Sequence, residues 1–378
     1  MYPAPHAPRT APPTRLAIIG CGFIGTVHSF AIRSIVRGGL ADAVVTATCD
    51  QDLDRAKRML EPHGGGTATT DIDEALADVD AAWVCTPTSS HLGAVERCVA
   101  HGVAVYCEKP LAGDLAGAEE IAALVGDSKL ANQVGLVLRS SPPVASIASM
   151  CRGERLRGAP DPGSLGAPMA AVLRDDQYFP VGGIYGSDWR ADVSVAGGGT
   201  LLEHSIHDVD LLTWMLGPVV SVGARTENHA GHPGVEDVAA VTLEHSGGAL
   251  STLVSVWHGI GSRPSTRRLE VFFERAHVVL EDEQVGPVKI QTGDTAMELG
   301  LPPEAFSLMD RLAVPDDLRP HLLAYAAADL EFVRSVASGG VPAPGIDVAL
   351  EAHRIVDAAY RSAALGGVPL EPERAARP

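Results

Sequence analysis

Lys109, Glu203 and His207 are the residues whose types and spacing best suit proton transfer at an alcohol or carbonyl carbon. Lys109 lies in the tripeptide Glu108-Lys109-Pro110, which directly follows a short apolar run. Partial burial lowers the pKa of a lysine and brings it closer to a working proton donor or acceptor. An ordinary surface turn explains the tripeptide equally well, so the tripeptide alone does not distinguish a catalytic lysine from a surface lysine.

Glu203 and His207 lie in the segment Gly197–Asp210, four residues apart. On one continuous helix this spacing places them on the same face, where the acid can orient the histidine for proton exchange. Thr200 and Glu203 also have the spacing of a capping box, which is a purely structural interpretation. Two i,i+4 acid–histidine pairs in the segment could chelate a metal, but no third ligand is evident, so the sequence predicts no metal site.

A glycine-rich turn over residues 20–25 has the pattern G-x-G-x-x-G. It follows the apolar run Leu16–Ile19 and opens a segment with helical spacing, as the dinucleotide fingerprint requires. Gly20 permits the tight turn, Gly22 lets backbone N–H groups approach a pyrophosphate, and Gly25 allows close helix–strand packing. The positive end of the helix attracts the phosphates. The predicted nucleotide contacts in this turn are Gly20, Gly22, Phe23, Ile24 and Gly25.

Asp50 ends the second apolar run, where a carboxylate accepts hydrogen bonds from the adenosine ribose. Because it repels a 2′-phosphate, NAD is favoured over NADP. Arg55 weakens that preference, although a solvated basic helix face is the simpler interpretation of this residue. Further nucleotide contacts are predicted at the carboxyl edge of the sheet, where open α/β sheets bind ligands. They are Thr86, Pro87, His91, Glu108 and Lys109.

Between Arg15 and about Ser140, short apolar runs alternate with helix-like segments. This pattern predicts a doubly wound parallel sheet with helices on both faces. The predicted strands are Leu16–Ile19, Val44–Cys49, Ala81–Cys85, Val103–Cys107 and Asn132–Leu138. Beyond a loop over Cys151–Pro168 and a helix over Leu201–Leu216, strand-like runs separated by turns predict a mostly antiparallel sheet. The predicted divisions are a tail (1–14), a Rossmann domain (15–140) and a substrate-binding and oligomerisation α/β domain (141–378).

Composition excludes several classes of protein. Hydrophobic residues make up 46% of the 378 residues and charged residues 20%, so two folded domains are expected. The net charge of −18 argues against binding to nucleic acid or to an anionic membrane, and no apolar stretch is long enough to span a bilayer. None of the six cysteines has C-x-x-C spacing, which favours buried thiols in a reducing compartment. The Pro/Ala-rich start lacks the apolar core of a signal peptide, so a disordered tail and a cytoplasmic location are expected.

Taken together, these motifs resemble the Gfo/Idh/MocA family of oxidoreductases over roughly residues 15–365. The resemblance implies a Rossmann domain followed by a domain with a large open antiparallel sheet, which forms a homodimer or homotetramer. It further implies that Lys109 hydrogen-bonds the reacting hydroxyl or carbonyl and that His207 is the leading proton donor or acceptor. Glu203 stands where many members have aspartate. The segment containing Trp189 and Arg190 resembles the one that lines the nicotinamide cleft, although core packing is an equal alternative for the tryptophan.

The resemblance implies a nicotinamide-dependent oxidoreductase acting on a small polyol: a sugar, a cyclitol, an amino sugar or a glycoside. One alternative is a glycosidase that uses tightly bound NAD in transient redox chemistry. Another is a non-catalytic nucleotide sensor on the same fold. Lys109 and His207 argue against the sensor, because sensing needs no proton-transfer groups.

Overall fold

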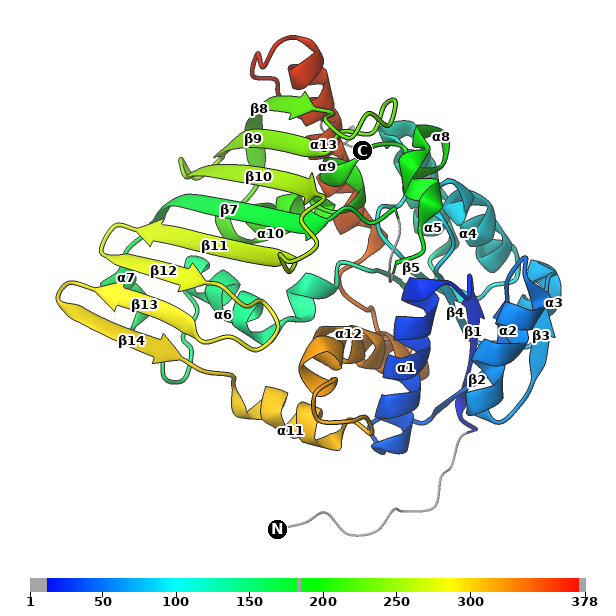
Figure 1. The fold of residues 1–378 in the computed structure, drawn as a ribbon. Coiled ribbons are helices and arrows are strands. Elements are labelled where there is room, and N and C mark those ends of the chain that lie inside the picture. Colours follow the sequence, from blue (N-terminus) through cyan, green and yellow to red (C-terminus); the bar gives the residue numbers. More distant parts are fainter. Residues whose placement is uncertain (1–11, 182–184, 374–378) are drawn as a thin grey trace, which may run out of the picture.

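The computed structural model describes residues 12–181 and 185–373 as two sheets with helices packed around them (Figure 1). Most of the predicted tail, residues 1–11, lies outside the described residues, and Thr14, the last residue of that prediction, already begins the first strand. No helix in the described part is both long and apolar enough to cross a membrane. All six cysteines are free thiols, and five of them are buried.

The first sheet has six parallel strands in the order β3-β2-β1-β4-β5-β6, which confirms the predicted doubly wound sheet. The order reverses between β1 and β4, and this opens a crevice at their carboxyl ends. The strands are β1 (Thr14–Ile19), β2 (Ala43–Cys49), β3 (Thr67–Thr69), β4 (Ala81–Val84), β5 (Ala104–Cys107) and β6 (Asn132–Val134). The helices are α1 (Phe23–Arg37), α2 (Leu53–Leu60), α3 (Ile72–Leu76), α4 (His91–Ala100) and α5 (Leu115–Ser128). The sequence did not predict β3 and α3, because elements this short show no period.

The second sheet has eight strands in the order β14-β13-β12-β11-β7-β10-β9-β8. It is antiparallel except where β7 pairs with β10, so the predicted large, mostly antiparallel sheet is confirmed. Its strands are β7 (Pro168–Tyr178), β8 (Val219–Glu227), β9 (Val238–His245), β10 (Leu250–His258), β11 (Thr266–Phe273), β12 (Ala276–Leu280), β13 (Val288–Thr292) and β14 (Thr295–Leu299). The remaining longer helices are α6 (Pro142–Cys151), α10 (Ile206–Leu216), α11 (Pro303–Arg311), α12 (Arg319–Ser338) and α13 (Ile346–Ala364).

The central strand β7 was missed by the sequence analysis. Its consecutive residues Asp175, Asp176 and Gln177 are all buried, so the strand lacks the alternation of apolar and polar residues that marks a half-buried strand. The predicted loop over Cys151–Pro168 contains the short helix α7 (Pro162–Leu165). A buried polar run inside a strand needs partners from other elements, and these become visible only in the folded chain.

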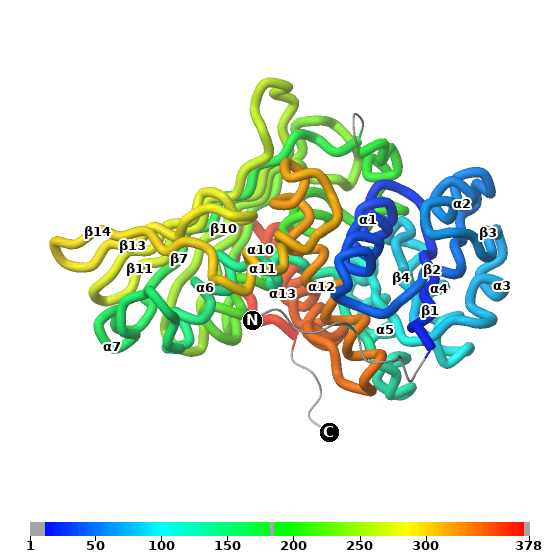
Figure 2. Tube along the Cα trace, turned by 90° about the horizontal axis from the view of Figure 1, so that it is seen from below, coloured from blue at the N-terminus to red at the C-terminus, as the bar shows by residue number. Residues whose placement is uncertain are grey.

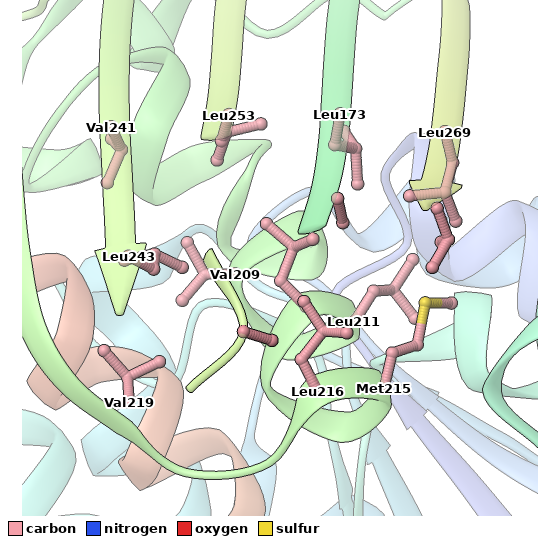
Figure 3. Close-up of a cluster of buried hydrophobic side chains, with 14 of the residues drawn as sticks. Leu173, Val209, Leu211, Met215, Leu216, Val219, Val241, Leu243, Leu253 and Leu269 are labelled. Carbon is pink, nitrogen blue, oxygen red and sulfur yellow. The ribbon is translucent and has the colours of Figure 1, made fainter. Parts of the chain in front are cut away.

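One face of the second sheet is covered by α6, α10 and α13 (Figures 1 and 2). The largest hydrophobic core lies between this face and the three helices. Leu173, Val241, Leu253 and Leu269 of four strands meet α10 across this core (Figure 3). The four strand residues are almost completely shielded from solvent. Burial of this kind contributes roughly 25 cal/mol per Å² of apolar surface, and it fixes the position of α10 against the sheet.

The predicted helix over Leu201–Leu216 is broken into α9 (Thr200–Glu203) and α10. The break falls at His204 and Ser205, where the backbone N–H of Ser205 donates to the carbonyl of Thr200, five residues back. The Ser205 Oγ lies 2.6 Å from Ser255 Oγ and 3.2 Å from an oxygen of Asp175, both in the sheet. These contacts hold Ser205 against the sheet at the point where the two helices separate.

The end of the chain returns to the first sheet. Helix α12 packs on α1, and both views place the two helices side by side (Figures 1 and 2). Phe332 of α12 is fully buried against the rings of Trp83 and Tyr106. The division near residue 140 stays a prediction, but the core of the first sheet includes residues from far beyond it.

Candidate active site

A cleft of about 810 Å³ lies at the carboxyl edge of the first sheet and is lined by residues of both sheets. Fourteen of the sixteen predicted site residues line it; Gly25 and His91 do not. They are Gly20, Gly22, Phe23, Ile24, Asp50, Arg55, Thr86, Pro87, Glu108, Lys109, Trp189, Arg190, Glu203 and His207. The folded chain therefore brings the three separate sequence motifs to one place.

The glycine turn fits a dinucleotide. Gly20 has φ +92°, and a Cβ there would lie 2.6 Å from the backbone of Cys85. A Cβ at Gly25 would lie 2.1 Å from the carbonyl oxygen of Gly20, so Gly25 serves the helix–strand packing and does not line the cleft. A Cβ at Gly22 would meet nothing within 4 Å, and the first turn of α1 contains no acidic residue. The positive end of α1 is therefore open to an anion, as pyrophosphate binding requires.

Asp50 follows β2 beside this turn. Its carboxylate accepts the backbone N–H groups of Cys21, at 2.8 Å, and of Asp52, at 2.9 Å. Arg55 approaches the same carboxylate at 3.6 Å. These contacts fix the acid at the rim of the cleft, and each of its oxygens retains a free lone pair for a hydroxyl donor.

His91 lies behind the site and not in it, which corrects its placement among the nucleotide contacts. Its ring is buried, with Nδ1 2.8 Å from the carbonyl oxygen of Pro110 and Nε2 3.0 Å from that of Thr86. The histidine thus ties the loop after β4 to the loop after β5. Position in the sequence placed it at the correct edge of the sheet but could not show which way the ring points.

The Lys109 ammonium points across the cleft, where Nζ donates to the backbone carbonyl of Glu203 at 2.7 Å. Burial lowers the pKa of Lys109 below its usual value, and the Glu203 carboxylate partly opposes this effect. Lys109 is therefore a cation that releases its proton more readily than an exposed lysine.

The Glu203 side chain neither caps a helix nor shares a continuous helix with His207, so both sequence interpretations of it are wrong. Thr88 donates to Oε1 at 2.6 Å, and Arg190 donates to Oε2 at 3.1 Å. The residue before α9 is Gly199, which has no side chain to cap it. Glu203 therefore joins the loop after β4 to the segment that carries Arg190.

His207 is the second residue of α10 and is only 7% exposed. Among the described residues its Nδ1 has no hydrogen-bond partner. Burial, reinforced by the positive charges of Lys109 and Arg267, holds the pKa of His207 well below its usual value. The imidazole is therefore neutral at pH 7 and can accept a proton.

Trp189 and Arg190 form one wall of the cleft. The guanidinium carbon lies 4.3 Å from the centre of the indole ring, and the tryptophan is only partly buried. The core-packing interpretation of Trp189 is therefore wrong. Stacking on the ring helps to orient the arginine toward Glu203.

The sequence analysis missed an ionic cluster on the wall formed by the second sheet. Arg267 of β11 is at its centre, and its guanidinium donates to Asp208 at 2.9 Å and to Asp175 at 3.0 Å. Glu283 lies at 3.5 Å, and His204 Nε2 at 3.0 Å. Burial raises the pKa of Asp208 to about 7.

The sequence signal for this cluster is the polar run Asp175–Gln177, which has no alternation of apolar and polar residues to mark it as a strand. His204 and Asp208 are one of the two acid–histidine pairs whose i,i+4 spacing could chelate a metal, but in the structure His204 Nε2 contacts Asp175 and Arg267. Within the described residues, no group of three or more His, Cys, Asp or Glu side chains is arranged to hold a metal ion.

Comparisons with known proteins identify the family. Residues 14–136 match the model described as the oxidoreductase family, NAD-binding Rossmann fold. Residues 154–279 match the GFO/IDH/MocA C-terminal domain. The two matches together span more than half of the chain, which therefore belongs to the Gfo/Idh/MocA family of oxidoreductases. The predicted family and its NAD cofactor are confirmed.

The chain is similar over nearly its whole length to inositol 2-dehydrogenase of Rhizobium meliloti (strain 1021), with 29% identity over 360 residues, 93% of this chain and 97% of the relative. An inositol dehydrogenase homolog from Azotobacter vinelandii, solved with NAD⁺, superimposes with a TM-score of 0.80 at 22% identity, covering 96% and 98% of the two chains. Levoglucosan dehydrogenase in complex with NADH and levoglucosan gives 0.81 at 18% identity, covering 96% and 100%. The two structural matches establish the shared fold.

Proposed function

We propose that the protein is an NAD-dependent dehydrogenase that oxidises one ring hydroxyl of an uncharged polyol, a cyclitol or a sugar. The observation that carries this proposal is the convergence of Lys109 and a neutral His207 in the cleft onto which the glycine turn opens. The similarity to an inositol 2-dehydrogenase supports the same class of substrate.

In the proposed mechanism, Lys109 and His207 hold the substrate hydroxyl between them. The Lys109 Nζ donates a hydrogen bond to its oxygen, and the neutral imidazole accepts its proton. The Glu203 carbonyl and carboxylate keep Lys109 and Arg190 in place. When bound, the nicotinamide supplies the two-electron acceptor for the alcohol carbon. Asp50 receives the ribose hydroxyls, and the N-terminus of α1 faces the pyrophosphate.

The charges of the cleft favour an uncharged substrate over an acid. Arg267 is surrounded by three carboxylates, and Arg190 is paired with Glu203. Arg55 lies beside Asp50 at the nucleotide end. Apart from Lys109, each cation among the described lining residues therefore has an acidic partner, and a substrate carboxylate would face the like charges of Asp175 and Glu283.

The direct test mixes the purified protein with NAD⁺ and a panel of inositols, aldoses, amino sugars, glycosides and uronic acids, and follows NADH absorbance. We expect a rise with neutral polyols, and a kcat/KM at least about tenfold lower for the uronic acid of the same ring, which corresponds to about 1.4 kcal/mol. A flat trace with release of sugar from a glycoside would favour the glycosidase. A flat trace with stoichiometric NADH binding and no reaction would favour the sensor.

The outer face of the second sheet is the proposed contact between two copies of the chain. Four apolar side chains on it, Val172, Leu250, Val254 and Phe272, are more than a third exposed. Helices cover the opposite face (Figure 2). Beside them Arg268 and Glu270, two residues apart on β11, offer charges of both signs. A two-fold axis through such a surface pairs apolar with apolar and acid with base.

We expect Val254→Asp to convert a dimer or tetramer into smaller species, because it buries a charge in that contact. Sedimentation velocity measures the change. Val341→Asp, at a residue that is 91% exposed away from the sheet, is the matched control and should leave the assembly intact. A wild-type protein that is monomeric at all concentrations would rule out the contact.

A further inference from the structure

A chain of three buried ionisable side chains lies beneath the Lys109 turn, and the mechanism above does not use it. His28 of α1 is in the middle. Its Nδ1 lies 2.7 Å from Asp329 of α12, and its Nε2 lies 2.9 Å from Glu108. The side chains of His28 and Asp329 are fully buried, and that of Glu108 is nearly so. Three elements that are distant in the sequence therefore meet at one imidazole.

The surroundings of His28 define its charge. The indole Nε1 of Trp83 donates to the same Asp329 oxygen at 2.9 Å, and the rings of Tyr106 and Tyr325 stand edge-on to the imidazole at 5.0 and 5.7 Å. When both carboxylates are ionised they accept from both ring nitrogens, so the imidazole holds a second proton and is positively charged. Burial lowers the pKa of His28, but the attraction of Asp329 and Glu108 exceeds this effect and raises it to about 10.

Glu108 transmits this contact to the reacting part of the cleft. While Oε1 faces His28, Oε2 accepts the backbone N–H of Lys109 at 3.2 Å. The backbone at Gly135 leaves the carboxylate little room to move, because a Cβ there would lie 2.3 Å from Oε1. His28 itself lies three residues after Gly25, so the helix that carries it begins at the glycine turn.

We propose that His28, as an imidazolium held between Glu108 and Asp329, is a positioning residue that fixes Lys109 relative to the nucleotide-binding turn. The proposal rests on the proposed role of Lys109 in catalysis. It adds that α1 has two functions: its first turn faces the nucleotide, and its second turn holds the lysine that faces the substrate. Displacement of a reacting group by about 1 Å costs on the order of 100-fold in rate, so this support matters for turnover.

The test compares wild type with His28→Gln, measuring kcat, KM for the polyol and the affinity for NAD⁺. We expect kcat to fall roughly 10- to 100-fold with NAD⁺ affinity within about threefold, because the glycine turn is retained while Lys109 loses its support. His101→Gln is the matched control: this partly exposed histidine faces Asp73 far from the cleft, and its replacement should change none of these quantities.

A second measurement follows the pKa of the Lys109 side chain and does not depend on turnover. The chain has only four lysines, Lys57, Lys109, Lys129 and Lys289. Protein labelled with ¹³C-lysine therefore gives four side-chain signals, and Lys109→Arg identifies one of them. We expect the pKa of Lys109 to rise in His28→Gln, because the negative charge of Glu108 is no longer offset by the imidazolium.

If His28→Gln does not fold, the double variant His28→Gln/Asp329→Asn removes one cation and one anion together and keeps the net charge of the cluster. The same loss of kcat is expected, since no cation holds Glu108. A folded variant with wild-type kcat and an unchanged Lys109 signal would overturn the proposal, and so would a parallel loss of kcat and NAD⁺ affinity. If the wild type oxidises no polyol, the proposed function fails and the Lys109 signal alone decides the inference.

Discussion

Replacement of Lys109 by alanine is expected to lower kcat by about 10²- to 10³-fold, the loss that follows removal of one hydrogen-bond donor at a reacting oxygen. Affinity for NAD⁺ should remain close to that of the wild type, because the glycine turn and Asp50 are on other loops. Steady-state kinetics and NADH fluorescence titration measure the two quantities separately. Lys57→Ala, at an exposed lysine of α2, is the control and should leave both unchanged.

Lys109→Arg adds a sharper distinction. Arginine keeps the positive charge but cannot release its proton in the accessible pH range. Because the proposed role of Lys109 is to donate a hydrogen bond while His207 accepts the proton, we expect the turnover of Lys109→Arg to exceed that of Lys109→Ala. A turnover as low as that of Lys109→Ala would instead indicate that the lysine exchanges a proton. Full turnover in Lys109→Ala would remove this residue from the mechanism.

Arg267→Met is expected to lower the free energy of unfolding by about 3–5 kcal/mol, the cost of leaving buried charges without their partner. In the wild type this guanidinium faces Asp175, Asp208 and Glu283, and its side chain is 13% exposed. Methionine has a similar volume, so the loss reports mainly the uncompensated carboxylates. Urea unfolding at pH 8 measures the difference. Arg275→Met, at an exposed arginine, should change stability by less than about 0.5 kcal/mol.

The effect of Arg267→Met should depend on pH. Burial already holds the pKa of Asp208 near 7, above that of an unfolded chain, and loss of the guanidinium raises it further. A carboxyl group whose folded-state pKa is raised binds its proton more tightly in the folded protein, so the variant regains stability as the pH falls. The difference in the free energy of unfolding between wild type and variant should therefore be smaller at pH 6 than at pH 8. Equal stability of the two proteins at pH 8 would contradict the charge assignment.

The nucleotide half of the site was predictable because its chemistry is local. The strand, the glycine turn and the helix are consecutive in the sequence, and the steric need for Gly20 and Gly25 is met within a few residues and one neighbouring loop. The Glu108–Lys109 turn was predictable to the extent that it follows an apolar strand at the same edge of the sheet. Here short-range pattern and tertiary structure agree.

The ionic cluster on the wall formed by the second sheet was not predictable, because its members are far apart in the sequence. Asp175 and Arg267 are 92 residues apart, and each is acceptable in the interior only because the other is present. At the break after Glu203, Ser205 likewise contacts Ser255 of a distant strand. Sequence periodicity identified α10 but could not show that its first turn is separated from α9.

The packing of α12 on α1 has a consequence for how the protein is made. Residues 14–136 leave the ribosome long before residue 332, so Trp83 and Tyr106 are without their Phe332 partner while roughly half of the chain is still being synthesised. Domains commonly fold as units during synthesis. In this protein Phe332 of α12 completes the aromatic cluster around Trp83 and Tyr106, so a fragment of residues 14–136 leaves exposed the ring surfaces that Phe332 covers.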